Sequence, residues 1–521
     1  MPASIQYDNL PMGWIGDWAG RRAAITPRRV ALYDAATDTR YTYAEMNDRA
    51  SRIGTYLVDR LGLKKGDIVC FIARNRIEAI DLYLACGKTG IILAPLSYRL
   101  TKHELDDLIA RIRPQMLFYE DVFAELAESL ALPESVGKTM VWEDGVSAWQ
   151  GEALATEPRD INIPLAQSDP YLYIHTGGTT ATPKICVVPH RQMLWNSLDI
   201  IVTSSGALAQ QRELLTFPLF HIGGWNTITP MFHAGGYTVL LREFEPGEVL
   251  ELIEREQITH FGAVEAMLLF LARHPRFREA RLESLHGITT GGAPCSPPAM
   301  RPFWERGVPV TQSYGLTEAG PSNFTYGAID HSLDEVWNYN ASIGTTFFHN
   351  DYQIVDQQTL QPVPRGEVGV LCMRSLHNFE RYLDQPERTQ QAFLDGGWVY
   401  SGDLAREDEK GYVYLVGRAD NMFITGGENV SPEEIENIVR QHSSVAEVAV
   451  LGVADANWGQ VPLALVVPKA GAAIDQEALL EHCRRYLAGY KIPRRFEVVE
   501  QLPMAGPGKV DRKILKARYG A

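Results

Sequence analysis

Long apolar runs, paired cysteines and an excess of positive charge are all missing from this chain of 521 residues. A membrane-spanning helix needs about 18 consecutive apolar residues, and no segment approaches that length. The opening segment, MPASIQYDNL, lacks the basic start and the apolar core of a secretory signal. We therefore expect a cytoplasmic protein that does not insert stably into membranes.

Basic residues are few relative to acidic ones. Lys and Arg total 49 against 64 Asp and Glu, which gives a formal net charge of −15. A chain with this charge is not expected to have nucleic acid as its partner. Hydrophobic residues make up 45% and charged residues 22%, which is the ordinary composition of a folded globular protein.

Two common motifs are also absent. The cysteines are far apart and form no C-x-x-C pair, so we expect reduced, packed thiols and neither a zinc site nor a redox dithiol. A Walker A loop is missing because the GKT tripeptides at Gly87 and Gly137 have Leu82 and Leu132 where that motif needs its first glycine. These absences exclude a P-loop NTPase.

Apolar, β-branched runs alternate with helical patterns through most of the chain. Ile68–Ala73 and Ile91–Ala94 have the composition of buried strands, and Arg76–Gly87 between them has a helical pattern. Further strands, each followed by a turn and a helical stretch, are expected at Tyr171–His175, Glu213–Phe217, Tyr237–Leu241, His260–Val264 and Gly287–Thr290. This alternation predicts an α/β fold of layered, mostly parallel βα subdomains.

The pattern changes near residue 417, which indicates a second domain. The order there is helix, strand, strand, helix, expected at Pro432–His442, Glu447–Val453, Pro462–Val467 and Gln476–Leu487. This order is typical of a small α+β domain. We place the boundary at residue 418, with a large N-terminal domain over 1–418 and a small, mobile C-terminal domain over 419–521.

The first helix of the small domain has a recognisable start. Ser431 is a candidate N-cap, Pro432 takes the first helical position, and Glu434 would complete a capping box. Residues 484–521 hold ten Lys or Arg against three acidic residues, a local excess of +7. Such a run is either a solvated tail or, because it surrounds a Gly-Pro-Gly-Lys turn, an anion-binding segment.

A threonine- and glycine-rich loop is the strongest local motif. Residues 176–184 read TGGTTATPK and come directly after the expected strand Tyr171–His175. Glycines let the backbone approach a phosphate, threonine hydroxyls offer donors, and Lys184 supplies charge, so the loop suits a polyphosphate clamp. Alone, the same composition is as typical of an ordinary surface loop.

Further motifs follow this loop in a fixed order. They are PLFH at 218–221, GGAP at 291–294, YGLTE at 314–318, GGWVYSGD at 396–403, GRAD at 417–420 and GPGK at 506–509. Their order and spacing resemble the adenylate-forming superfamily of acyl-CoA synthetases, nonribosomal-peptide adenylation domains and firefly luciferase. The resemblance runs from Leu63 to Lys509, which is most of the chain.

The resemblance implies a nucleotide site. The threonine- and glycine-rich loop would hold the β- and γ-phosphates, GGAP would border the adenine, and an acid and an arginine would hold the ribose. The implied ATP- and AMP-binding residues are Thr176, Gly177, Gly178, Thr179, Thr180, Lys184, Gly292, Ala293, Pro294, Ser313, Tyr314, Gly315, Asp403 and Arg418.

Four residues would carry the chemistry. Glu318 would bind Mg²⁺, which prefers oxygen ligands and phosphates, and Thr317 would contact the α-phosphate. Lys509 would bridge the acid carboxylate and the phosphate, where a mobile positive charge suits the developing negative charge. His221 would lie between the acyl and nucleotide sites, although a single histidine among apolar residues is also typical of a core or capping position.

The same resemblance implies sites for the acid and for coenzyme A. The acid pocket would involve Trp225, Glu265, Ala266, Gly315 and Ala319, and an aromatic such as Trp225 is as often part of a core. Asp420 would be the hinge of the small domain. The coenzyme A contacts would be Gly426, Gly427, Trp458, Tyr490 and Arg494, each of which is also compatible with plain surface packing.

Some positions depart from the family pattern. Ala181 and Ile185 stand where the threonine- and glycine-rich loop usually has glycine, which would restrict its backbone without removing phosphate binding. Glu265 replaces a common proline, so the shape of the acid pocket is expected to differ. Met504 replaces a common arginine, so the loop that carries Lys509 is expected to be ordered differently.

The sequence therefore predicts an ATP-dependent acid–CoA ligase. The carboxylic acid, ATP and CoA would be its small-molecule partners, with Mg²⁺ as cofactor, and the acid would be apolar, either fatty or aryl. The chain ends soon after Lys509, which favours a free-standing ligase. Two alternatives remain open: an adenylating enzyme that loads a carrier protein, and a nucleotide-binding homologue that has lost turnover. Whether the chain forms a homodimer is also open.

Overall fold

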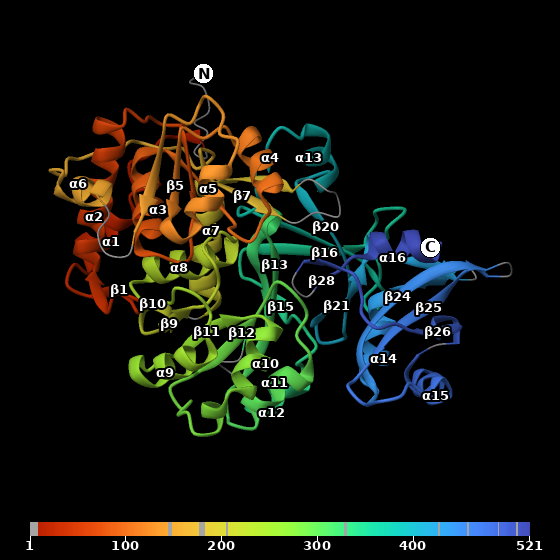
Figure 1. The fold of residues 1–521 in the computed structure, drawn as a ribbon. Helices are drawn as coiled ribbons and strands as arrows, with labels where there is room; N and C mark the ends of the chain where they lie inside the picture. Colours follow the sequence, from red (N-terminus) through yellow and green to blue (C-terminus); the bar gives the residue numbers. More distant parts are fainter. Residues whose placement is uncertain are drawn as a thin grey trace, which may run out of the picture. The chain divides into compact units, whose positions relative to one another are not determined.

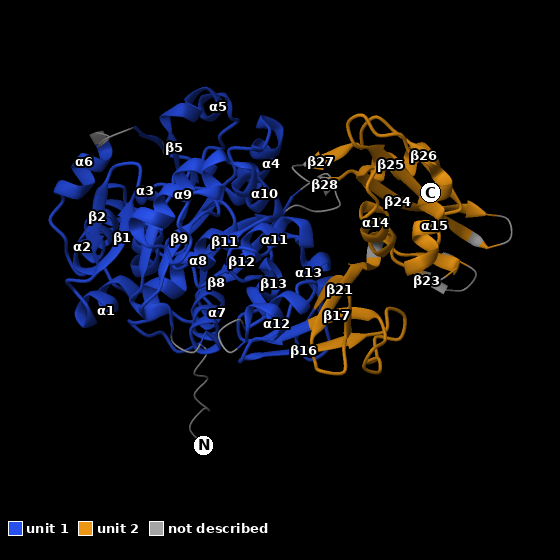
Figure 2. Cartoon of the chain, turned by 90° about the horizontal axis from the view of Figure 1, so that it is seen from below, with its two compact units in different colours: residues 1–352, 373–399 blue, residues 353–372, 400–521 orange. Residues whose placement is uncertain are grey.

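The computed structural model describes residues 9–143, 148–176, 183–204, 207–327, 331–425, 428–455, 458–487, 489–506 and 509–520. Figure 1 shows that these residues combine helices and strands throughout, as expected for an α/β chain. The chain divides into two compact units (Figure 2). Unit 1 comprises residues 1–352 and 373–399, and unit 2 comprises residues 353–372 and 400–521.

A nine-stranded sheet in the described part of unit 1 has the order β15-β14-β13-β12-β11-β9-β10-β1-β2. Its inner strands from β13 to β1 run parallel, while β2 at one edge and β14 and β15 at the other pair antiparallel. The strands are β1 (Val30–Asp34), β2 (Thr39–Thr42), β9 (Arg212–Leu215), β10 (Tyr237–Leu240), β11 (His260–Ala263), β12 (Gly287–Thr290), β13 (Val310–Leu316), β14 (Gly320–Thr325) and β15 (Thr345–Thr346).

A seven-stranded sheet in the same described ranges has the order β18-β8-β7-β4-β3-β5-β6. Four of its pairings, from β7 through β4, β3 and β5 to β6, are parallel. The strands are β3 (Ile68–Ile72), β4 (Ile92–Leu96), β5 (Met116–Glu120), β6 (Lys138–Trp142), β7 (Pro170–Thr176), β8 (Lys184–Pro189) and β18 (Arg381–Tyr382). The predicted strands of the βαβ series are therefore present in both sheets.

One connection differs from the prediction. The strand expected at Tyr171–His175 is not followed by a helix, because β7 pairs antiparallel with β8, from Thr176 opposite Lys184 to Pro170 opposite Pro189. The segment of β8 reads KICVVP and its side chains after Lys184 are buried, as expected for β-branched residues in a sheet interior. The two strands bring Thr176 and Lys184 to the same end of the sheet.

Along the chain the helices of unit 1 alternate with these strands, and in space they pack on the faces of the sheets (Figure 1). All residues of α3 are buried, including the charged Glu78, Asp81 and Lys88, so this helix has no solvent-facing side. The helices are α1 (Trp18–Ile25), α2 (Tyr43–Thr55), α3 (Ile77–Thr89), α4 (Lys102–Ile112), α5 (Ala124–Ser129), α6 (Ala148–Ala155), α7 (His190–Thr203), α8 (Ile222–Ala234), α9 (Pro246–Glu256), α10 (Glu265–Arg273), α11 (Pro297–Trp304), α12 (Leu333–Asn338) and α13 (Pro386–Ala392).

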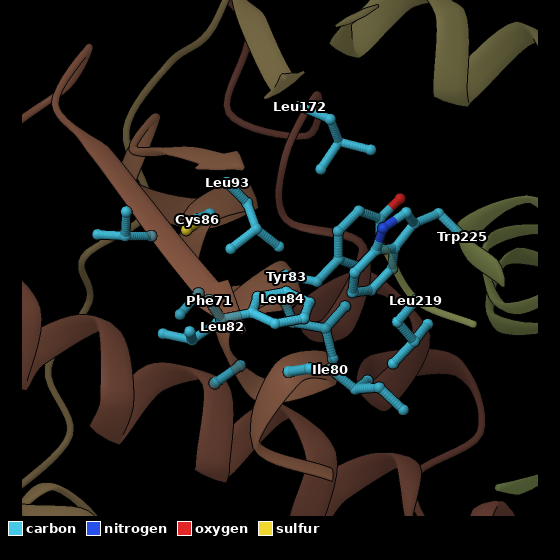
Figure 3. Close-up of a cluster of buried hydrophobic side chains, with 14 of the residues drawn as sticks. Phe71, Ile80, Leu82, Tyr83, Leu84, Cys86, Leu93, Leu172, Leu219 and Trp225 are labelled. Carbon is cyan, nitrogen blue, oxygen red and sulfur yellow. The ribbon is translucent and has the colours of Figure 1, made fainter. Parts of the chain in front are cut away.

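A column of stacked rings runs through the core of unit 1. Trp225 of α8 stacks on Tyr83 of α3 with ring centroids 4.5 Å apart, and Figure 3 shows the two rings side by side. Tyr83 stacks on Tyr171 of β7 at 4.7 Å, and Tyr171 stacks on His190 of α7 at 4.2 Å. The column joins two helices, a strand and the start of a third helix, and such ring pairs contribute about 0.5–1.5 kcal/mol each beyond burial.

His190 makes the stability of this core depend on pH. Its ring is fully buried, and neither ring nitrogen has a hydrogen-bond partner within the described ranges. Burial lowers the pKa of the imidazole to about 3, from 6.5. Between these two values the unfolded chain binds a proton that the folded chain does not, so acidification through this range removes stability.

We expect His190→Phe to abolish part of this acid sensitivity. Phenylalanine keeps the stack on Tyr171 and cannot titrate, so it should recover up to about 2.5 kcal/mol of the stability lost between about pH 6.5 and about pH 4.5. Urea unfolding of both variants across this range measures the difference. The exposed His286→Phe is the matched control, and an equal acid response in wild type and His190→Phe would refute the assignment.

Unit 2 contains the small α+β sheet that the sequence predicts. In its described part a five-stranded sheet has the order β23-β22-β25-β24, with β26 paired to β25. Its elements are β22 (Phe423–Thr425), β23 (Glu428–Val430), α14 (Pro432–Arg440), β24 (Val445–Asp455), β25 (Gly459–Pro468), α15 (Gln476–Tyr486), β26 (Arg495–Val498), β27 (Met504–Gly506), β28 (Lys509–Val510) and α16 (Arg512–Tyr519). The predicted helix, strand, strand, helix order is confirmed.

A further sheet has the order β16-β17-β20-β19, with β21 paired to β20. Its strands are β16 (Asn350–Val355), β17 (Gly369–Ser375), β19 (Phe393–Leu394), β20 (Trp398–Glu407) and β21 (Val413–Arg418). The division between the two compact units at 399 and 400 falls within β20, and residue 418 is the last residue of β21, which pairs with β20. A functional boundary at residue 418 stays a prediction.

The predicted capping box is wrong. Ser431 is the N-cap of α14 and Pro432 begins the helix, but the Ser431 side chain makes no capping bond. Its hydroxyl donates instead to the Val416 carbonyl at 2.6 Å, and Glu434 accepts from the Lys491 ammonium at 2.7 Å. Both partners lie outside the helix, so packing against other segments replaces the local cap.

The structure bears on the predictions for the cysteines and for membrane-spanning helices. All six cysteines are buried and free, which confirms the packed thiols. None of the helices within the described ranges has the length and hydropathy that crossing a bilayer requires.

Candidate functional site

Four parallel strands of the nine-stranded sheet deliver predicted site residues to one edge. In the sheet β9, β11, β12 and β13 are consecutive neighbours, so the loops after their carboxyl ends lie together. His221 follows β9, Glu265 follows β11, Gly292 follows β12 and Thr317 follows β13. This edge is where open α/β sheets bind ligands.

The turn after β12 is open to solvent. Gly292, Ala293 and Pro294 are exposed, and a Cβ atom at Gly292 would meet nothing within 4 Å. Gly292 has a φ of +80°, a left-handed conformation that glycine adopts without strain. The amide of Cys295 donates to the Gln312 side chain at 2.9 Å, which anchors the end of the turn to β13.

The hairpin of β13 and β14 fixes the backbone before Thr317. The Ser313 hydroxyl donates to the Phe324 carbonyl at 2.8 Å, and Tyr314 packs edge-on against the Phe324 ring. Gly315 lies so close to the neighbouring strand that a Cβ atom there would stand 2.3 Å from the Pro321 carbonyl oxygen. Only glycine fits at this position.

We expect Gly315→Ala to destabilise unit 1. The added methyl group meets backbone atoms, which cannot rotate away as a flexible side chain would, and overpacking of this kind costs about 1–3 kcal/mol. Thermal unfolding measures the loss. Gly327→Ala is the matched control because a Cβ atom there meets nothing within 4 Å, and equal unfolding temperatures for the two variants would contradict the expectation.

Glu318 is held beside a lysine and a tyrosine. The Tyr382 hydroxyl donates to Glu318 Oε1 at 2.6 Å, and Lys184 Nζ donates to the same hydroxyl at 3.3 Å. Lys184 also lies over the Tyr382 ring, 4.7 Å from its centroid. The side-chain amide of Gln192 on α7 donates to the Thr317 carbonyl at 2.6 Å, so α7 holds the backbone of this turn.

A buried histidine and aspartate hold the far side of this turn. His377 Nδ1 lies 2.9 Å from the Ala319 carbonyl, and its Nε2 lies 3.3 Å from Asp199 Oδ2. Asp199 is on α7 and also contacts Nδ1 of His349 at 3.0 Å. The Ala319 side chain is fully buried, so this residue contributes its backbone to the turn.

His221 and His175 both have pKa values below the ordinary value for histidine. His221 is the N-cap residue of α8. Its side chain is exposed at the surface, but nearby protein atoms partly desolvate the imidazole ring. This desolvation and the Arg99 guanidinium hold the pKa of the His221 imidazole below its ordinary value. Burial, with a smaller effect of His221, lowers the pKa of His175 to about 4.

The predicted acid-pocket residues differ in their burial and in their contacts. Trp225 is fully buried in the ring column described above, and its indole nitrogen has no hydrogen-bond partner within the described ranges. Glu265 begins α10 and accepts hydrogen bonds from the hydroxyl and the amide of Ser296, the N-cap residue of α11. Ala266 is exposed. The structure therefore places Trp225 in the core and ties Glu265 to the neighbouring helix.

Unit 2 brings together two predicted ribose ligands. Asp403 and Arg418 are directly opposite in the β20–β21 ladder, and Arg418 donates to Asp403 at 2.9 Å. Their side chains are 18% and 44% exposed, so both remain accessible. An acid and an arginine in this arrangement offer an acceptor and donors to a pair of hydroxyl groups.

The candidates for coenzyme A are partly assembled. The Arg494 guanidinium lies 5.9 Å from the centroid of the exposed Trp458 ring. Tyr490 packs against the hydrophobic core of unit 2 instead, and Lys491 lies over its ring at 5.6 Å. An arginine beside an exposed indole provides a cation and an aromatic face, as expected for a surface that contacts a nucleotide.

Several predicted residues lie outside the described part. They are Gly177, Gly178, Thr179, Thr180, Gly426 and Gly427. The side chains of Asp420 and Lys509 are likewise outside it, although their backbones belong to a short helical turn and to β28.

The sequence analysis missed Tyr382 and Gln192. Tyr382 comes 64 positions after Glu318 and belongs to none of the recognised motifs. Its two-residue strand β18 pairs with β8, which is the strand that begins at Lys184. The one sequence signal for Tyr382 is weak: the segment RYL before Pro386 has the composition of a short strand.

The donor set around Glu318 fits a hard divalent cation. Within the described ranges no group of three or more His, Cys, Asp or Glu side chains is arranged to hold a metal by itself. Burial raises the pKa of the nearby Cys186 thiol, so it is no thiolate ligand. One carboxylate that is completed by phosphate oxygens is the usual protein contribution to bound Mg²⁺.

Comparisons with known proteins match two family models. The AMP-binding enzyme model matches residues 20–383, and the AMP-binding enzyme C-terminal domain model matches residues 434–509.

Individual relatives span nearly the whole chain. Feruloyl-CoA synthase from an Amycolatopsis species is 34% identical, over 97% of this chain and 99% of that protein. A long-chain-fatty-acid–CoA ligase from Mycobacterium tuberculosis is 29% identical, over 98% of this chain and 99% of that protein. Among solved structures, ATP-bound MatB from Rhodopseudomonas palustris matches with a TM-score of 0.86 at 28% identity, over 97% of this chain and 99% of that one.

Proposed function

The chain belongs to the AMP-binding enzyme family, and from this membership we propose that it is an ATP-dependent acid–CoA ligase for an aryl or fatty acid. Adenylate-forming CoA ligases use ATP, Mg²⁺ and CoA. The observation that carries the proposal is the joining of Lys184, Tyr382 and Glu318 at the strand ends. This assembly offers a cation and a carboxylate to the same polyphosphate.

In the first half-reaction an oxygen of the acid carboxylate attacks the α-phosphorus of ATP. The bond to pyrophosphate breaks, and the products are an acyl-adenylate and pyrophosphate. Bound Mg²⁺, held by Glu318, would shield the phosphate charges. Lys184 would bind the outer phosphates, and Thr317 with Lys509 would stabilise the charge that develops at the α-phosphate.

Two sets of residues are proposed to contact the nucleotide. Gly292–Pro294 and Tyr314 would border the adenine, and Gly315 would let the backbone approach it. Asp403 and Arg418 would bind the ribose hydroxyls. His221 would stay neutral near the reacting carboxylate, since its pKa lies below the ordinary value, and would offer a hydrogen bond without attracting the acid as an ion pair.

In the second half-reaction the thiol of CoA attacks the acyl carbonyl. The thioester forms, AMP leaves, and the thiol proton goes to solvent. We propose that residues 419–521 reorient about Asp420 between the two steps, so that Lys509 gives way to the turn at Gly426 and Gly427. Gating of this kind is a recognised use of a mobile domain.

The acid is proposed to be aromatic or aliphatic, with aromatic acids tested first. The feruloyl-CoA synthase is 34% identical and the fatty-acid ligase is 29% identical. Glu265, the one charged residue predicted in the pocket, accepts two hydrogen bonds from Ser296 at its Oε1 atom, which ties this carboxylate to the neighbouring helix.

A substrate panel tests the proposal. Pyrophosphate release with Mg²⁺ and ATP is measured for hydroxycinnamic, benzoic, fatty and amino acids, with and without CoA, and products are identified by mass. We expect one aryl or fatty class to give AMP and acyl-CoA in equal amounts. Pyrophosphate without thioester would favour a carrier-protein acceptor, and ATP binding without any release would favour a homologue without turnover.

A further inference from the structure

Tyr382 stands between two opposite charges at the strand ends. Its hydroxyl donates to Glu318 Oε1 at 2.6 Å and accepts from Lys184 Nζ at 3.3 Å. Only 4% of the residue is exposed. A buried hydroxyl that both donates and accepts in this way has its orientation fixed by its two partners.

Backbone hydrogen bonds also hold Tyr382 in place. In the β18–β8 pairing Tyr382 is opposite Cys186, two positions from Lys184. The Tyr382 amide donates to the Thr389 hydroxyl at 3.0 Å, and the Leu383 amide donates to the Ile185 carbonyl at 2.8 Å. The tyrosine therefore has a fixed position relative to the strand that carries Lys184.

The ring has a fixed position as well. Phe379 packs edge-on against Tyr382 with centroids 4.9 Å apart, and the Phe379 amide donates to the Glu318 carbonyl at 2.9 Å. The same short segment thus holds the backbone of Glu318 and, through Tyr382, its carboxylate. One bond from this segment holds the Glu318 backbone, and the other holds its carboxylate.

The tyrosine also separates the two charges. In the described part of the chain Lys184 and Glu318 form no direct ion pair, and both contact the Tyr382 hydroxyl instead. A direct pair would satisfy each charge with the other and would compete with a phosphate and a cation for them. The hydroxyl occupies one carboxylate oxygen and leaves the second available.

We propose that Tyr382 is a positioning residue that aims Glu318 at the divalent cation and keeps Lys184 free for the phosphates. This inference rests on the proposed function, because it concerns the cation that accompanies ATP. Residues that hydrogen-bond to a metal-binding carboxylate orient it, and their removal lowers metal affinity or activity by about 10–100-fold.

Tyr382→Phe tests the proposal because it removes the hydroxyl and keeps the ring. Calorimetry measures how strongly Mg²⁺ promotes binding of α,β-methylene-ATP, an analogue that cannot release pyrophosphate. We expect the Mg²⁺ concentration at half-maximal binding to rise about tenfold, and kcat to fall with little change in KM for the acid. Unchanged Mg²⁺ dependence would overturn the proposal.

A double-mutant cycle shows whether Tyr382 acts through Glu318. In a Glu318→Ala background the carboxylate is gone, so Tyr382→Phe should have no further effect on Mg²⁺-dependent binding. If Tyr382→Phe weakened Mg²⁺-dependent binding by the same factor with and without Glu318, the proposal would be overturned. The control is Tyr173→Phe, a buried tyrosine of β7, and a loss there equal to that in Tyr382→Phe would also overturn it.

Measurements on the wild-type protein distinguish failure of the proposed function from failure of the inference about Tyr382. If it neither binds the analogue in a Mg²⁺-dependent way nor releases pyrophosphate with any acid, the proposed function fails and the inference fails with it. If wild type does both and Tyr382→Phe matches it in both, the inference alone fails.

Discussion

Glu318→Gln is expected to lower acid-dependent pyrophosphate release by about 10²–10³-fold. The amide has the shape of the carboxylate and still accepts the hydrogen bond from Tyr382, but it has no negative charge for the cation that shields the phosphates. The fold should persist, since Glu318 is half-buried in a short turn. Release is measured at saturating ATP over a range of Mg²⁺ concentrations.

The matched control for this substitution is Glu387→Gln. Glu387 is an exposed carboxylate in the first turn of α13, close in sequence to Tyr382 and outside the proposed site. It should release pyrophosphate at the wild-type rate. Wild-type activity in Glu318→Gln, or an equal loss in both variants, would contradict the role assigned to Glu318.

Lys509→Ala is expected to separate the two half-reactions. Adenylation should fall by about 10²–10³-fold, because the variant loses the charge that is proposed to bridge the carboxylate and the α-phosphate. Conversion of supplied acyl-adenylate to acyl-CoA should stay close to wild type, since the lysine has no role in this step of the proposed mechanism. Rapid-quench assays that start from ATP plus acid, and separately from acyl-adenylate plus CoA, measure the two steps.

Lys513→Ala is the control for this lysine. Lys513 is an exposed residue of the basic C-terminal segment and should be silent in both assays. An equal loss of both half-reactions in Lys509→Ala would show that the lysine acts on folding or on CoA binding. Loss in both lysine variants would favour general attraction of anions by the basic segment.

The elements that the sequence predicts well depend on local signals. Gly287–Thr290 forms β12 with the predicted bounds, and the helix expected from Pro432 begins there. Hydrophobic periodicity and proline at a first helical position are properties of a few consecutive residues. The β7–β8 hairpin and the bond from Ser431 to Val416 depend on partners elsewhere, so no local pattern indicates them.

The site follows the same division. The roles proposed for Thr317 and Glu318 come from a motif that carries them, and the sheet places their loop beside those of its neighbours. Motif position gives no side-chain direction, so the sequence left open whether Trp225 lines a pocket or belongs to the core, and the structure packs it on Tyr83. Tyr382 could not be assigned from sequence because its proposed role depends on the pairing of β18 with β8.

Transfer of isotopically labelled oxygen tests the central claim most directly. The acid is supplied with heavy oxygen in its carboxylate, together with ATP, Mg²⁺ and CoA, and AMP is analysed by mass. Attack of the carboxylate on the α-phosphorus places one labelled oxygen in the bridge of the acyl-adenylate, and thioester formation leaves that oxygen in AMP. We predict one labelled oxygen per AMP and one in the acyl-CoA. Unlabelled AMP, or ADP with label in inorganic phosphate, would contradict the account.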